Sequence, residues 1–190
     1  MAAASSFPRP TGLALAGLVG LGFLLSACSN AVFKREETRP CPPVRLEAST
    51  AQLTQFRPGP GRDLTDVVLE ADLTGYQGAC QYDDDEGVVR VDLTLSFAAA
   101  LGPAATERRQ AFAYYVAIPR FYPDPKGKQV FETAIAFPEG TDRVRYAGEE
   151  LSLELPIAES GTAEDLPVYV GFQLTPEQME YNRAQGAGGR

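Results

Sequence analysis

The sequence predicts an all-β domain, an antiparallel β-sandwich of about seven strands followed by one short helix. Three observations lead to this prediction: short runs in which apolar and polar side chains alternate, glycines and prolines between those runs, and one helix-start motif near the end of the chain. Of the 190 residues, 44% are hydrophobic and 22% are charged, so the chain has enough apolar surface to form a packed core.

The clearest strand lies at residues 87–98, where polar residues alternate with the apolar residues Val89, Val91, Leu93, Leu95 and Phe97. A period of two is typical of a strand that buries one face. Weaker alternation predicts six further strands, at residues 44–48, 67–73, 111–118, 130–137, 151–157 and 168–172.

Turn-forming residues separate these runs, at 57–61, 83–87, 101–103, 119–127, 138–140 and 160–161. Seven strands with this spacing predict an immunoglobulin-like antiparallel β-sandwich. Only the architecture is immunoglobulin-like, because the chain has no tryptophan and so lacks the Cys–Trp–Cys signature of true immunoglobulin domains.

A short helix is predicted after the last strand. Thr175 is suited to cap it, Pro176 to occupy its first position, and Gln178 to bond back to the capping residue. We expect this helix to end near Ala184 and residues 186–190 to form a loose, disordered tail.

The N-terminus has the features of an export signal. Arg9 precedes an apolar run from Gly12 to Leu25, which is shorter than the roughly 20 residues that a membrane-spanning helix needs. The run ends in Leu25-Ser26-Ala27-Cys28, which resembles the lipobox of bacterial lipoproteins. The resemblance implies cleavage before Cys28 and lipidation of its thiol.

This resemblance sets the expected organisation and location. It gives a signal peptide at 1–27, a lipidated tether at 28–43, a β-sandwich domain at 44–185 and the tail. Several acyl chains anchor a protein stably, because each buried methylene contributes roughly 0.8 kcal/mol. Ser29 follows the cysteine where enteric inner-membrane lipoproteins often carry Asp, which favours the outer membrane, facing the periplasm.

Lipidation of Cys28 leaves Cys41 and Cys80 as the remaining cysteines of the chain. In an oxidising periplasm these two are expected to form a disulfide. The bond would close a loop of about 40 residues and add roughly 3 to 4 kcal/mol of stability.

Charge and composition exclude several functions. The net charge is −8, and it becomes −9 from Cys28 onward because Arg9 is the only charged residue before it, so nucleic-acid binding is not expected. The chain has no histidine, which removes the usual general base and the commonest transition-metal ligand. No GxSxG motif occurs, and we expect no catalytic residues, metal or cofactor.

Three segments carry possible binding chemistry. Residues 83–86 place four carboxylates in one turn, which is either a solvated hairpin turn or a Ca²⁺ site. The loop at 57–66 is either an anion-binding loop or, as we favour, a rigid crossover in which Arg62 pairs with Asp63 or Asp66.

The third segment is aromatic. Tyr114 and Tyr115 precede a loop that contains Arg120, Phe121 and Tyr122, residue types typical of protein contacts. Alternation would bury one of the two tyrosines, and Phe121 could instead close the end of the sandwich. If the domain binds a partner, we expect Arg120, Phe121 and Tyr122 to contact it.

The stretches at 56–63 and 170–178 resemble small envelope lipoproteins of alphaproteobacteria, a resemblance that implies no activity. We therefore expect a membrane-anchored lipoprotein that acts as a non-catalytic protein-binding or structural module. Its expected partners are the lipid bilayer, through Cys28, and another envelope protein. The alternative is a glycan- or small-ligand-binding module, or a carboxylate-dependent hydrolase with two convergent acids in a deep cleft.

Overall fold

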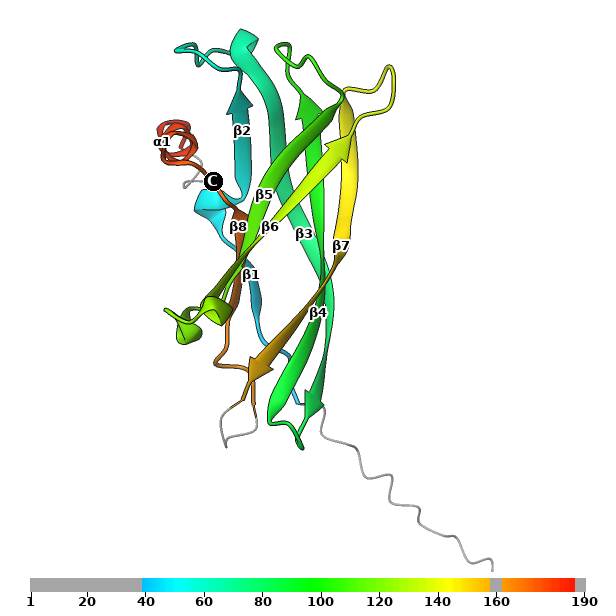
Figure 1. The fold of residues 1–190 in the computed structure, drawn as a ribbon, viewed down its shortest axis with the longest axis vertical. Helices are drawn as coiled ribbons and strands as arrows, with labels where there is room; N and C mark the ends of the chain where they lie inside the picture. Colours follow the sequence, from blue (N-terminus) through cyan, green and yellow to red (C-terminus); the bar gives the residue numbers. More distant parts are fainter. Residues whose placement is uncertain (1–38, 158–161, 187–190) are drawn as a thin grey trace, which may run out of the picture. The chain divides into compact units, whose positions relative to one another are not determined.

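Two four-stranded sheets form the domain in this computed structural model, which describes residues 39–157 and 162–186 (Figure 1). The first sheet has the order β1 (Val44–Leu46), β8 (Val168–Phe172), β5 (Arg109–Ala117) and β6 (Lys128–Ala136). The second has the order β2 (Gln52–Phe56), β3 (Val67–Asp83), β4 (Val88–Leu101) and β7 (Arg143–Pro156). Only the β1–β8 pairing is parallel among these strands, and one helix, α1 (Pro176–Ala184), follows β8. The predicted all-β sandwich is confirmed.

Several features predicted from the sequence fall on residues that the structure does not describe. The signal peptide at 1–27, Cys28, the tether up to residue 38, the turn at 160–161 and the tail from residue 187 lie outside the described residues. The residues that are described belong to one compact unit of the chain.

All seven predicted strands are present, but the alternation does not predict β2 and underestimates β3. Only Leu53 of β2 is buried, so this edge strand carries little periodic signal. Strand β3 continues to Asp83 beyond a bulge that shifts its register between Leu73 and Gly75, and residues 76–79 after the bulge are all exposed, so the alternation stops there. A local break in a pattern therefore hides a continuous strand.

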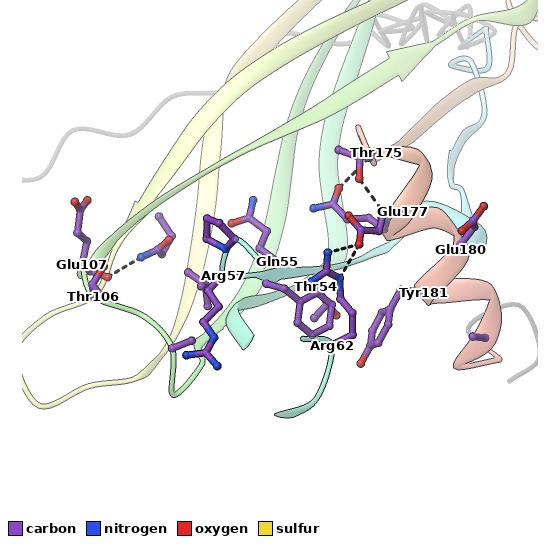
Figure 2. A pocket seen from close by; sticks show the side chains of 17 residues that line it. Thr54, Gln55, Arg57, Arg62, Thr106, Glu107, Thr175, Glu177, Glu180 and Tyr181 are labelled. Carbon is purple, nitrogen blue, oxygen red and sulfur yellow. Dashed lines mark hydrogen bonds and ion pairs between the residues drawn. The ribbon is translucent and has the colours of Figure 1, made fainter. Parts of the chain in front are cut away.

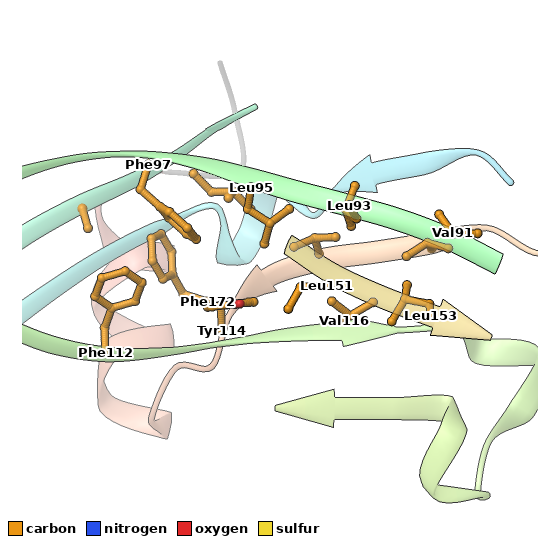
Figure 3. Close-up of a cluster of buried hydrophobic side chains, with 14 of the residues drawn as sticks. Val91, Leu93, Leu95, Phe97, Phe112, Tyr114, Val116, Leu151, Leu153 and Phe172 are labelled. Carbon is orange, nitrogen blue, oxygen red and sulfur yellow. The ribbon is translucent and has the colours of Figure 1, made fainter. Parts of the chain in front are cut away.

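The core lies between the two sheets and includes a group of aromatic rings around Phe97 of β4 (Figure 3). The Phe97 ring centroid lies 5.3 Å from that of Phe112 and 5.8 Å from that of Phe172. Tyr114 is buried here, whereas Tyr115 is half-buried, with its hydroxyl 3.0 Å from that of Thr50. The prediction that one tyrosine of the pair is buried is confirmed.

Residues 39–43, the lead-in segment, are fixed onto the end of the second sheet. The predicted Cys41–Cys80 disulfide is present, with a Cα–Cα distance of 5.7 Å. The Arg39 guanidinium makes two bonds of 2.7 and 2.9 Å to the Asp84 carboxylate and lies 3.9 Å from the centroid of the Tyr82 ring. The chain therefore joins the fold beside the β3–β4 turn.

The predicted helix and its capping box are confirmed. The Thr175 hydroxyl accepts from the backbone N–H of Gln178 at 3.2 Å, and the side-chain oxygen of Gln178 accepts from the backbone N–H of Thr175 at 2.9 Å. The buried Asn182 side chain donates to the Gln52 carbonyl at 2.9 Å, which fixes α1 beside β2. Within the described residues, no helix has the length and apolar character needed to cross a membrane.

Candidate binding groove

A groove of about 970 Å³ runs between helix α1, strand β2, the β2–β3 loop and the segment before β5 (Figure 2). It lies beside β2, which is the edge strand of the second sheet, and beside the beginning of β5, which is an inner strand of the first sheet. Its lining mixes aromatic, amide and charged side chains, including Phe56, Tyr181, Gln55, Gln110, Arg57 and Arg62. This mixture is typical of a site that orients a ligand with a few polar contacts.

Arg62 holds one wall of the groove together. Its Nε donates to Glu177 Oε1 of α1 at 2.7 Å, and its Nη1 donates to the Gly59 carbonyl at 2.7 Å. Its guanidinium carbon lies 5.3 Å from the centroid of the Phe56 ring, and that ring meets Tyr181 edge-on at 4.9 Å. The β2–β3 loop and the helix thus form one continuous surface.

The predicted pairing of Arg62 with Asp63 or Asp66 is wrong. Asp66 is only 3% exposed and accepts instead from Arg57, whose Nε lies 2.6 Å from Asp66 Oδ1. Asp63 caps the 3₁₀ turn Leu64–Asp66, and hydrogen bonds from Thr65 hold the pKa of its carboxyl below the ordinary value. The error arises because helix α1, distant in sequence, supplies the acid that Arg62 meets.

The mouth of the sandwich is polar at positions where the alternation would place core residues. Gln55 follows the inward-facing Leu53 on β2, and Gln110 precedes the inward-facing Phe112 on β5. The Gln55 amide donates to the Ala111 carbonyl at 3.0 Å, so it bridges the two sheets. Polar residues are unexpected at inward positions of a strand unless they serve a function, so these glutamines mark the groove as a candidate site.

Two partly unpaired strand edges lie next to residues that line this groove, at Gln110 on β5 and at Thr54 on β2. Strand β8 pairs with β5 only over residues 114–117, and beyond it the Gln173 N–H donates to the Ala113 carbonyl at 2.9 Å. Because Arg108 O accepts from Phe137 N, the even-numbered residues of β5 bond to β6, and Arg109 and Ala111 direct their backbone groups to the open side. On β2 the same alternation directs the backbone of Thr54 away from β3.

The carboxylates of the groove do not form a convergent pair. Glu177 is engaged by Arg62. Figure 2 shows Glu107 and Glu180 at opposite ends of the view, on different elements. The groove therefore lacks the arrangement that the hydrolase alternative requires of these three acids.

The acidic turn at 83–86 connects β3 and β4, as the hairpin interpretation predicts. The Asp83 carboxylate accepts from the Glu86 N–H at 3.1 Å and from Arg90 Nη1 at 2.9 Å, and these bonds lower the pKa of Asp83. Arg90 also reaches Glu154 at 3.3 Å. In the parts of the chain that the structure describes, no three acidic or cysteine side chains are grouped to hold a metal.

The aromatic loop lies at the other end of β5 from the groove. Phe121 is half-buried and packs against the core, whereas Arg120 is exposed and Tyr122 is 80% exposed. The structure therefore does not bring Arg120, Phe121 and Tyr122 together with the groove residues. Contact of this loop with a partner stays a prediction.

Sequence reasoning missed the groove because its residues come from four separate segments. Gln55 and Gln110 gave the available signal, since both interrupt an apolar alternation. Fold and groove together define the protein as an all-β sandwich with a helix-flanked groove at one open edge. No protein-family model, curated protein or solved structure matches the chain.

The Arg57–Asp66 pair predicts an asymmetric effect of substitution. Asp66 is 5% exposed at its side chain and Arg57 is 60% exposed, so Arg57→Ala leaves a buried carboxylate without its cation. Asp66→Asn leaves only a solvated guanidinium. We expect Arg57→Ala to cost about 1–3 kcal/mol and Asp66→Asn to cost less, measured by urea unfolding. Equal losses, or a larger loss for Asp66→Asn, would contradict this explanation.

Proposed function

We propose that this protein is a lipid-anchored envelope protein whose sandwich domain binds an extended segment of another envelope protein in the helix-flanked groove. The proposed anchor is Cys28 in the outer membrane, with the domain in the periplasm. The lipobox-like Leu25–Cys28 and the preceding apolar run support the anchor. The Cys41–Cys80 disulfide fits an oxidising compartment.

The edge of β5 at Arg109 and Ala111, which pairs with no strand of the described residues on the side away from β6, is the observation that carries the binding proposal. Extended peptides commonly bind by adding a strand to such an edge, where main-chain hydrogen bonds give affinity and side-chain pockets give specificity. The Gln55 amide already donates to the Ala111 carbonyl, as the N–H of an added strand would. Phe56 and Tyr181 offer apolar contacts beside it.

The position of the lead-in segment fits this proposal. Cys80, which is bonded to Cys41, and the groove residue Val68 lie 12 positions apart on β3. That separation corresponds to roughly 40 Å of strand. The groove therefore lies toward the opposite end of β3 from the lead-in segment, through which the domain would be joined to the proposed anchor.

The test is cross-linking and pull-down of the tagged full-length protein from membranes, with Ala111→Pro as the groove variant. Proline removes the outward N–H of Ala111 without removing a ladder bond to β6. The matched control is Glu132→Pro on β6, whose N–H also points away from its paired strand. A Cys28→Ala variant tests the anchor.

We expect a reproducible envelope partner with wild type and Glu132→Pro, and a reduction of at least about tenfold with Ala111→Pro, since the added strand loses the main-chain hydrogen bond from the Ala111 N–H and meets the proline ring instead. Equal recovery with both proline variants would contradict binding in the groove. Loss of the partner only on substitution of Arg120, Phe121 and Tyr122 by alanine would move the site to the aromatic loop. A groove that retains glycans instead of protein would favour the ligand-binding alternative.

A further inference from the structure

The outer face of the second sheet carries a shallow trench of about 400 Å³ with opposite charges on its two sides. Its floor is formed by Ala98 and Ala100 of β4, which alternate with residues of the core. The neighbouring strand β3 contributes two acids, and β7 on the other side contributes two arginines: Glu70, Asp72, Arg143 and Arg145.

Strand register places these charges in matching rows. Glu70 and Arg143 both pair with Ala100, and Asp72 and Arg145 both pair with Ala98. Residues directly opposite in antiparallel strands share a face, so each row holds an acid, an alanine and an arginine. The acids and the arginines lie two strand spacings, or roughly 10 Å, apart.

These charges are not neutralised within the described part of the molecule. All four side chains belong to exposed residues. Over residues 39–157 and 162–186 none of them forms an ion pair, although Asp72 accepts from the Gln52 amide at 3.0 Å. By contrast, Arg57, Arg62, Arg90 and Arg108 elsewhere in the domain all have acidic partners.

We propose that this face binds a second copy of the same chain around a two-fold axis that runs along β4. Such an axis lies between the second sheet of one copy and the second sheet of the other. The rotation exchanges the acidic and the basic side of the trench. It brings Glu70 of one copy to Arg143 of the other and Asp72 to Arg145, twice over. A two-fold contact must be complementary to itself, and this arrangement of charges satisfies that condition. Because the alanine side chains of the floor are small, the second sheets of the two copies can approach each other closely.

The other in-plane axis, perpendicular to the strands, would oppose acids to acids and arginines to arginines. The choice of axis has a consequence that rests on the proposed function. An axis along the strands leaves both lead-in segments at the same end of the dimer, because the strands of the two copies then run in the same direction. Both copies could therefore be anchored in one membrane, which raises their local concentration and supports a weak contact.

The test uses two differently tagged full-length chains, coexpressed and recovered from membranes, with one tag used for capture. One variant reverses the acids, Glu70→Lys with Asp72→Lys, and the other reverses the arginines, Arg143→Glu with Arg145→Glu. We expect wild type to capture wild type, and each variant to capture itself at least about tenfold less well, since attraction becomes repulsion in every pair.

Coexpression of the two opposite variants should restore capture, because one then presents only basic and the other only acidic side chains. Restoration also shows that both variants fold. Salt of about 0.5 M should weaken capture of wild type, since exposed charges are screened within a few ångströms. Glu132→Lys with Glu139→Lys makes the same change in charge outside the trench and should leave capture unchanged.

Failure of wild type to capture itself, unchanged self-capture by either charge-reversal variant, or no restoration by the mixed pair would each overturn the proposed dimer. The outcome is separable from that of the groove experiment. Ala111→Pro should reduce recovery of the envelope partner and leave capture of the second copy intact.

Discussion

Replacing Phe97 by alanine is expected to lower the free energy of unfolding by about 3–5 kcal/mol, the range seen for large aromatic residues in cores. Phe97 is 1% exposed, and its ring lies within 6.3 Å, centroid to centroid, of those of Phe112, Tyr114, Tyr146 and Phe172. These residues come from three strands besides β4 and from both sheets, so the cavity would remove packing contacts between the two sheets. Urea unfolding followed by far-UV circular dichroism gives the value.

The exposed Leu64 provides a matched control. It is 75% exposed, so Leu64→Ala should change stability by no more than about 0.5 kcal/mol. A loss of less than about 1 kcal/mol for Phe97→Ala would mean that Phe97 is not tightly packed among these rings.

Replacing both Cys41 and Cys80 by serine is the second substitution with a large expected effect. The two residues are 39 positions apart, and the loop-closure entropy of a bridge of that length corresponds to roughly 4 kcal/mol. The double substitution avoids the unpaired thiol that a single one would leave. We expect the midpoint of urea unfolding to fall, with the largest local effect on the lead-in segment.

Proteolysis can localise this effect. Without the disulfide, Arg39 still contacts Asp84 and the Tyr82 hydroxyl still donates to the Pro40 carbonyl at 2.5 Å, but these contacts are at the surface. Limited proteolysis should therefore cut near residues 39–43 before it cuts the sheets. Cleavage that begins in β4 or β5 would show that the disulfide supports the whole sandwich equally. Resistance equal to that of the wild type would contradict any role in stability.

The strongly periodic parts of the fold could be predicted from the sequence. Buried and half-buried residues alternate along strand β4, so the sequence shows which of its residues face the core. The Thr175–Gln178 capping box is a local signal contained within four residues. The Cys41–Cys80 disulfide is the pairing expected if Cys28 is lipidated. Edge strand β2 and the second half of β3 could not be predicted, because one buries a single apolar residue and the other contains a bulge.

The candidate groove and the charged trench could not be located in this way. Gln55 and Gln110 are 55 positions apart, and a pattern along the chain does not say that a sandwich brings them to one mouth. Arg62 had two acids nearby in sequence, yet it bonds to Glu177, which lies 115 positions away. The rows of the trench likewise depend on register between β3, β4 and β7.

The sequence by itself therefore determined the fold class and the capped helix, because short-range periodicity and local hydrogen bonds decide these features. It predicted the disulfide partners through the expectation that the third cysteine, Cys28, is lipidated. Only the tertiary structure decided which arginine meets which acid, where the sandwich stays open and which charges face each other across β4. These contacts depend on strand order and register. Residues at very different distances along the chain can become neighbours in space, so their spacing in the sequence does not predict the contact.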